Sequence, residues 1–149
     1  MEAILTKTIN VPDRAEPLNE WETERDQALF VSHGYWCEII RHPAHGSLCG
    51  YVYMGKHHPY AGEESPDVEV HGGITYNDGK KMGFDCAHAG DLIPYMSRYR
   101  TRAGHIHDPD ETYRNWAYVK GQVENLAAQL RAVDPIMDIQ PREIPNKDV

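Results

Sequence analysis

The segment from residue 69 to residue 91 constrains the fold most, because it holds two β-type runs separated by a strong turn signal. Residues 68–76 are rich in valine, isoleucine, threonine and tyrosine, which favour a pleated, half-buried surface. Residues 81–87 alternate large apolar side chains with smaller or polar ones. Asn77-Asp78-Gly79-Lys80 lies between the runs, and an Asp-Gly pair is typical of a tight turn. The segment therefore predicts an antiparallel hairpin.

The pairing within this hairpin decides which side chains meet. If residues 78–79 form a two-residue turn, His71 lies opposite Cys86 and Glu69 lies opposite His88. Directly opposed side chains have Cβ atoms about 5 Å apart. We therefore expect four ionisable groups to share one small area at the end of the hairpin.

A second register is equally open. A three-residue loop at positions 77–79 shifts the pairing by one residue and places His71 opposite Asp85. In either register Gly72 and Gly73 remove side-chain bulk beside the histidine, so that a ligand can approach the backbone N–H groups closely.

A metal site is one interpretation of this cluster. His71, Cys86 and His88 offer the nitrogen and sulfur ligands that zinc takes, and Glu69 or Asp91 would serve as a fourth ligand or as a general base. Three ligands and an open position would form a hydrolytic site. The spacing matches none of the strong zinc signatures, such as paired CxxC or HExxH, so the interpretation is geometric.

A thiol enzyme is the second interpretation. Cys86 would be the nucleophile, His71 its activating base and the amides of residues 72–73 the oxyanion donors, with Asp85 or Asp91 orienting a histidine. The structural alternative is that Cys86 is a small buried apolar residue, as free cysteines in strands usually are.

The competing class is a non-catalytic binding protein that sequesters a signalling nucleotide. Tyrosines offer stacking surfaces, and the long loop at residues 55–67 is of a kind that often binds ligands. The same tyrosines and loop also suit a homodimer whose pocket lies at a subunit boundary. We expect the following residues to contact a small, anionic, nucleotide-like ligand: His58, Gly72, Gly73, Asp85, Arg98 and Arg100.

Four short motifs resemble those of a known family. They are LCGYV at residues 48–52, HPYAG at 58–62, HGGITY at 71–76 and GFDCAHAGD at 83–91. Together they are similar to a family of small uncharacterised bacterial and bacteriophage proteins, and the resemblance covers roughly positions 35 to 92.

The resemblance implies an intracellular, phage-encoded accessory protein. It also implies which positions are functional in such a protein, namely His71, Gly72, Gly73, Cys86, His88 and Asp91. Family members carry an aromatic pair before the GFDCAH-like run, whereas this chain has Lys80-Lys81-Met82.

The rest of the chain predicts an α+β domain. Residues 35–41 and 48–54 read as a central hairpin, and residues 18–30 read as a helix with Asn19 as its N-cap. An Asp-Pro pair at 108–109 and an apolar stripe to Val133 predict a long C-terminal amphipathic helix. We expect this helix to pack on one face of a mainly antiparallel sheet of about 4–6 strands.

Length and charge bound the remaining possibilities. The 149 residues predict a single domain, 1–149, with an N-terminal arm at 1–17 and a C-terminal tail at 134–149. A net charge of -8 argues against duplex nucleic acid as a partner. There is no apolar run of about 20 residues and no secretory pattern, so we expect no membrane contact and a cytoplasmic location in a bacterial cell or phage-infected host.

Overall fold

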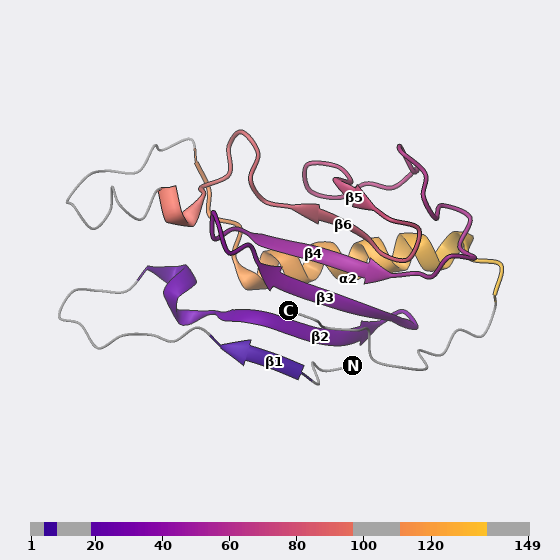
Figure 1. Ribbon diagram of the computed structural model, residues 1–149, viewed down its shortest axis with the longest axis horizontal. Coiled ribbons are helices and arrows are strands. Elements are labelled where there is room, and N and C mark those ends of the chain that lie inside the picture. The colour runs from indigo at the N-terminus through magenta and orange to yellow at the C-terminus, as the bar shows by residue number, and fades with distance from the viewer. Residues whose placement is uncertain (1–4, 9–18, 97–110, 137–149) are drawn as a thin grey trace.

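The computed structural model describes residues 5–8, 19–96 and 111–136, with only the backbone described for residues 5–8. A six-stranded antiparallel sheet has the order β1-β2-β3-β4-β6-β5. Helix α2 (Trp116–Val133) lies against one face and contacts β2, β3 and β4 (Figure 1). The predicted α+β architecture is confirmed. The strands are β1 (Leu5–Thr8), β2 (Arg25–Ser32), β3 (Tyr35–Arg41), β4 (Leu48–Tyr53), β5 (Tyr76–Asn77) and β6 (Met82–Asp85).

The central hairpin predicted from the sequence is β3 and β4, paired so that Cys37 faces Val52 and Ile40 faces Cys49. All three cysteines are buried free thiols. The core lies between this hairpin and α2. Gly50 of β4 marks the closest approach, because a Cβ atom there would lie 2.4 Å from Cγ2 of Val123. The helix contributes the buried residues Val119, Val123, Leu126, Ala127 and Leu130 to this core.

The helix predicted for residues 18–30 is wrong. Asn19 does begin a helical turn, and its N–H donates to the carboxylate of Glu22 at 2.7 Å, but the turn is the short 3-10 helix η1 (Glu20–Thr23). Strand β2 follows it, between β1 and β3. The consecutive residues 28–30 are all buried. A strand buried on both faces reads as a continuous apolar run, so its period of two was hidden.

The long C-terminal helix begins later than predicted. Its N-cap is Asn115, whose side-chain oxygen accepts a hydrogen bond from the N–H of Tyr118 at 2.9 Å. Residues 111–115 are not helical, and the predicted cap at 108–109 lies outside the described residues. The helix ends at Val133, where the apolar stripe predicted its end. Asp134 follows, and the proline after it disfavours a further helical residue.

The hairpin of β5 and β6 has neither predicted register. Tyr76 pairs with Gly83 and Asn77 pairs with Met82, which leaves a four-residue connection at 78–81. The carboxylate of Asp78 accepts the N–H groups of residues 80 and 81, which stabilises this wider turn.

Strand β5 is also far shorter than the predicted run at 68–76. Gly72 and Gly73 have φ angles of 68° and 83°, which an extended strand does not allow. Instead the N–H of Gly73 donates to the carbonyl of Val70 at 2.9 Å and forms a turn. This turn places His71 near the segment that follows β6.

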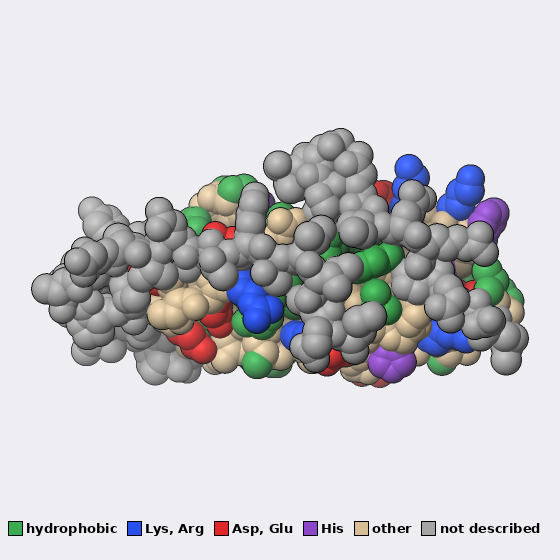
Figure 2. Space-filling view, turned by 90° about the horizontal axis from the view of Figure 1, so that it is seen from below, with side chains coloured by type: hydrophobic (Ala, Val, Ile, Leu, Met, Phe, Trp, Pro, Cys, Tyr) green, Lys and Arg blue, Asp and Glu red, His purple; other side chains and the backbone are tan. Residues whose placement is uncertain are grey.

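The described residues also include a part of each predicted terminal segment. Residues 5–8 of the predicted N-terminal arm form an edge strand, and most of the predicted tail lies outside the described residues. In the part of the chain that the structure describes, no helix is long and apolar enough to span a bilayer. Seen from below, basic and acidic side chains are interspersed on the described surface (Figure 2).

Candidate functional site

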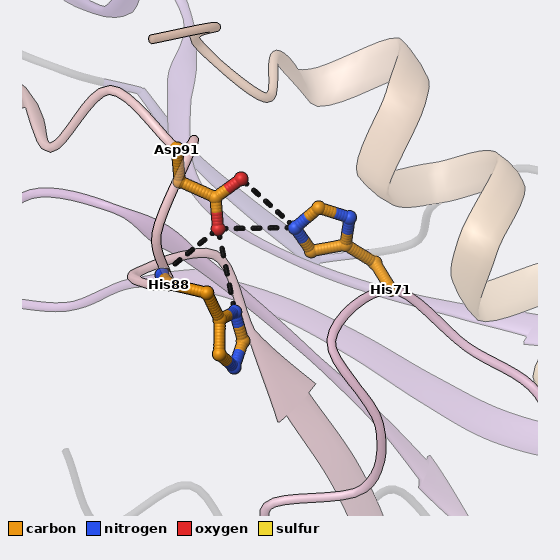
Figure 3. A group of neighbouring side chains, drawn as sticks. All are labelled: His71, His88 and Asp91. Atoms are coloured by element: carbon orange, nitrogen blue, oxygen red, sulfur yellow. Dashed lines mark hydrogen bonds and ion pairs between the residues drawn. The ribbon is translucent and has the colours of Figure 1, made fainter. Parts of the chain in front are cut away.

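Two imidazoles and one carboxylate converge near the first turns of α2. One ligand atom from each of His71, His88 and Asp91 lies within 4.8 Å of the other two. Figure 3 shows both rings turned toward the oxygens of Asp91. His71 comes from the turn before β5, whereas His88 and Asp91 come from the segment after β6. Two stretches on either side of the β5–β6 hairpin thus build one cluster.

Gly72 is what allows the two stretches to come this close. A Cβ atom at this position would lie only 2.3 Å from Cε1 of His88. The sequence predicted that the glycine pair leaves room for a ligand. For Gly72 the space is filled by the ring of His88, whereas a Cβ at Gly73 would meet nothing within 4 Å.

Helix α2 holds the first stretch in place through two glutamine side chains. The N–H of His71 donates to the side-chain oxygen of Gln122 at 2.8 Å, and the N–H of Glu69 donates to that of Gln129 at 2.8 Å. The side-chain amide of Gln129 donates back to the carbonyl of Glu69 at 2.7 Å. The helix therefore supplies the hydrogen bonds that a neighbouring strand would otherwise provide.

Asp91 is the centre of the cluster and is buried. His71 Nε2 lies 3.0 Å from both carboxylate oxygens, and Arg114 Nε donates to Oδ1 at 2.8 Å. The Oδ2 atom also accepts the backbone N–H of His88 at 3.0 Å and lies 3.3 Å from His88 Nδ1. Burial acts to raise the pKa of Asp91, but these hydrogen bonds outweigh it and hold the pKa below its usual value. The group is therefore a carboxylate at neutral pH.

The two imidazoles differ in their outer contacts. Nδ1 of His71 lies 2.8 Å from the hydroxyl of Tyr118, and Nε2 of His88 lies 3.4 Å from Oδ1 of Asp85. Each ring therefore has one nitrogen directed at Asp91 and the other held by a second polar group. The side chain of His88 is about one-third exposed, so the cluster is open to solvent on that side.

Arg114 and Tyr118 were not identified from the sequence as site residues. Two backbone hydrogen bonds bring the segment before α2 alongside Asp91: the N–H of Thr112 donates to the carbonyl of Gly90, and the N–H of Leu92 donates to the carbonyl of Thr112, each at 2.8 Å. Arg114 lies one residue before the N-cap Asn115, and Tyr118 lies in the first turn of α2. No local sequence signal shows that this end of the helix covers Asp91.

Cys86 lies outside the close group of ligand atoms. Only 2% of its surface is exposed, and it packs in the hydrophobic core with the residues of α2. Burial raises the pKa of the Cys86 thiol, and the charge of Asp91 raises it further. The surroundings of Cys86 therefore agree with the structural alternative, in which it is a small buried apolar residue.

Other predicted site residues are placed elsewhere. The side chain of Glu69 is exposed, and only its backbone is tied to α2. His58 is buried at the other end of α2, where Nε2 lies 2.8 Å from the carbonyl of Leu130 and Nδ1 accepts the N–H of Tyr60. This histidine closes the end of the helix. Two predicted ligand contacts, Arg98 and Arg100, lie outside the described residues.

Comparison with known proteins adds no assignment. No family model, no curated protein and no solved structure matches the chain. The resemblance of the four sequence motifs to a bacterial and bacteriophage family therefore stays a prediction.

Proposed function

We propose that His71, His88 and Asp91 bind a divalent transition metal, zinc in the first instance, and that the protein uses it to hydrolyse a small, anionic, nucleotide-like ligand. Two imidazoles and a carboxylate are a donor set that zinc takes in catalytic sites. This assignment keeps both histidines of the sequence-based metal hypothesis and replaces Cys86 by Asp91.

Two of the three distances within the cluster are close to those around such an ion. A tetrahedral ion bound about 2.0–2.1 Å from each ligand atom separates those atoms by about 3.3 Å. Oδ2 of Asp91 lies 3.0 Å from His71 Nε2 and 3.3 Å from His88 Nδ1. Arg114 donates to the other oxygen, Oδ1, and so leaves Oδ2 facing the two rings. One oxygen and two ring nitrogens thus lie within 4.8 Å of one another.

The observation that carries the proposal is that each of the three ligands has an outer partner of its own. Metal-binding histidines usually donate their second ring N–H to a carboxylate or other acceptor, which orients the ring. The second nitrogen of His71 has the hydroxyl of Tyr118 at 2.8 Å, and that of His88 has Asp85 at 3.4 Å. The carboxylate ligand has the guanidinium group described above. Ordinary surface histidines do not need such support on both sides.

The chemistry of such a site is the activation of water. A divalent ion held by His71, His88 and Asp91 would supply an activated water, because such an ion lowers the pKa of a bound water to about 7. In the hydrolysis, a water oxygen would form a bond to the electrophilic phosphorus or carbon atom of the ligand, and the bond to the leaving oxygen would break. The leaving oxygen keeps the electron pair and takes up a proton, while the proton from the water passes to solvent. The protein's own residues hold the ion and keep its carboxylate ligand ionised.

Elemental analysis of the purified protein tests the metal. We expect about one equivalent of zinc, lost in His71→Ala and retained in the matched control His57→Ala, because His57 is an exposed histidine outside the cluster. Cys86→Ala should also retain the metal, which separates this site from the one predicted from the sequence. Metal-free protein whose thermal stability is unchanged by a chelator would contradict the proposal.

Hydrolysis needs a second assay. Zinc-loaded protein is incubated with a panel of nucleotides, and the products are identified by mass spectrometry. We expect product with the parent protein and none with His71→Ala. Nucleotide that is recovered intact, but that raises the melting temperature with its concentration, would identify a binding protein instead.

A non-catalytic binding protein is the second candidate, and one observation favours it. Four nitrogen atoms of His71, His88 and Arg114 already lie within hydrogen-bonding distance of the Asp91 carboxylate, so its charge is compensated without an ion. A site of this kind would sequester a signalling nucleotide without cleaving it.

The third candidate, a hydrolase with Cys86 as nucleophile and His71 as base, has less support. A thiol nucleophile acts as the thiolate, which burial in an apolar core disfavours.

The proposal also includes a cellular location: the motif resemblance and the acidic composition support a cytoplasmic accessory protein of a bacterium or phage. A homodimer with the pocket at a subunit boundary belongs to the same proposal.

A further inference from the structure

Arg114 is held on two sides but keeps part of its hydrogen-bonding capacity. Its Nε donates to Oδ1 of Asp91 at 2.8 Å, and its Cζ lies 5.2 Å from the centroid of the Tyr118 ring. Its terminal amino groups have no hydrogen-bond partner within residues 19–96 and 111–136. The side chain is 27% exposed. A guanidinium group that is fixed in this way keeps both terminal amino groups available for a ligand beside the cluster.

A fixed fork suits an oxyanion. The two terminal amino groups of arginine match the spacing of two oxygens on a phosphate or a carboxylate. Because the Asp91 contact and the Tyr118 ring already restrict this side chain, little rotamer entropy is lost when a ligand binds. Arg114 is therefore preorganised, whereas exposed lysines elsewhere on the surface are not.

The charge of the occupied site also calls for an anion. A divalent ion next to Arg114 exceeds the single negative charge of Asp91, even when the nearby Asp85 is counted. The site would then be locally positive in a chain whose net charge is -8. An anionic ligand bound between the ion and the guanidinium group of Arg114 would neutralise this excess positive charge.

We infer that Arg114 is the residue that recognises a phosphoryl group of the substrate, and that it selects phosphate over carboxylate. The inference rests on the proposed function, because the bound ion supplies one of the contacts. A phosphoryl group can offer two oxygens to the fork and a third to the ion. A carboxylate has only two oxygens and cannot serve both partners fully. Tyr118 is a positioning residue, because it supports both the guanidinium group and the ring of His71.

The test measures metal binding and anion binding separately on the whole protein. Co²⁺ replaces zinc, because its visible absorption reports on its ligands, and the Co²⁺-loaded protein is titrated with inorganic phosphate and with acetate. The variant is Arg114→Gln. The matched control is Lys120→Gln, which removes the same charge from the same helix, where Lys120 pairs with Glu124 instead of the cluster. Circular dichroism confirms that each variant is folded.

We expect Lys120→Gln to bind Co²⁺ as the parent does, and Arg114→Gln to bind it about 10–100-fold more weakly, because Asp91 loses its outer partner. Phosphate is therefore titrated into each protein at saturating Co²⁺. Phosphate affinity should fall about 10–100-fold in Arg114→Gln, since a hydrogen bond to a charged group contributes about 1.5–3 kcal/mol. It should be unchanged in Lys120→Gln, and the parent should bind acetate at least about 10-fold more weakly than phosphate. Arg114→Lys, which keeps the charge without the fork, should fall between the parent and Arg114→Gln.

Three results would overturn the inference: phosphate affinity that is equal in Arg114→Gln and Lys120→Gln, acetate that binds as tightly as phosphate, or a parent that binds Co²⁺ but no phosphate. The last result leaves the metal proposal intact. If the parent binds no Co²⁺ but binds phosphate through Arg114, the metal proposal fails while the role of this arginine stands.

Discussion

Replacement of Gly72 by alanine tests whether the cluster is a binding site that depends on the close approach of its two stretches. Gly72 has a φ of 68°, and an added Cβ would lie 2.3 Å from Cε1 and 2.6 Å from Nδ1 of His88. The neighbouring Gly73 has a φ of 83°, and its Cβ would meet nothing within 4 Å. Both alanine variants pay a similar backbone cost of about 1–2 kcal/mol. They differ in the contact with the histidine ring.

The size of the effect follows from the contact distances. Ordinary contacts of a Cβ are 3.4–4 Å long, so the ring of His88 would have to retreat by about 1 Å. Metal sites tolerate deviations of only about 0.2 Å from ideal ligand distances. We therefore expect Gly72→Ala to weaken zinc binding about 10–100-fold, as when a supporting contact of a metal site is lost. This range corresponds to about 1.4–2.8 kcal/mol of binding free energy.

The assay is competition for zinc against a chromophoric chelator at neutral pH, together with a urea melt of each metal-free variant. Gly73→Ala should lose stability but keep its zinc affinity within about twofold of the parent. If the two variants lose zinc affinity equally, the backbone conformation of the turn is responsible and the reasoning from the His88 contact is refuted. If neither loses affinity, His88 is not a ligand.

The remaining predictions concern stability. Hydrogen bonds lower the pKa of Asp91 and so stabilise the fold at pH values above the ordinary pKa of about 3.9. This stabilisation is lost as the pH falls through the pKa of the folded state. In urea melts from pH 7 to pH 2, the free energy of unfolding should therefore depend less on pH for Asp91→Asn than for the parent. Tyr35→Phe removes a buried hydrogen bond of 2.6 Å to Asp134 and should lower the free energy of unfolding by about 1.5–3 kcal/mol in a urea melt. An unchanged free energy of unfolding would show that this contact does not hold the end of α2. Gly50→Ala should cost about 1–3 kcal/mol through overpacking, whereas Gly121→Ala, with nothing within 4 Å of its Cβ, should raise the melting temperature by adding about 1 kcal/mol. Equal effects of the two alanines would contradict the packing argument.

The sequence predicted the pairing of β3 with β4 correctly because each strand has its own β-type pattern and a Pro- and Gly-containing turn separates them. It failed at β2, since a strand that is buried on both faces shows no alternation. It placed the start of α2 too early, because an Asp-Pro pair at 108–109 fits a helix cap but residues 111–115 are not helical. Local signals identify an element better than its boundary.

For the site, the sequence predicted that His71 and His88 lie close together, but for the wrong reason. The paired residues of β5 begin at Tyr76, and the positive φ angles of Gly72 and Gly73 interrupt the extended backbone before it. The two histidines meet because the turn at these glycines brings His71 beside the segment after β6. Asp91 joins them through a turn that the sequence could not place. Arg114 belongs to the cluster only because the segment before α2 crosses at this point, which is a tertiary fact.

Helix α2 contacts the cluster through its first turns. His71 forms hydrogen bonds with the hydroxyl of Tyr118 and the side chain of Gln122. Asp91 accepts a hydrogen bond from Arg114, which lies one residue before the N-cap of α2. The cluster is therefore complete only when the helix is docked. A ligand that bridges the two histidines should slow amide hydrogen exchange in the first turns of α2, far along the chain from the atoms it touches. The protection of this helix against exchange is thus a direct measure of how fully the cluster is assembled.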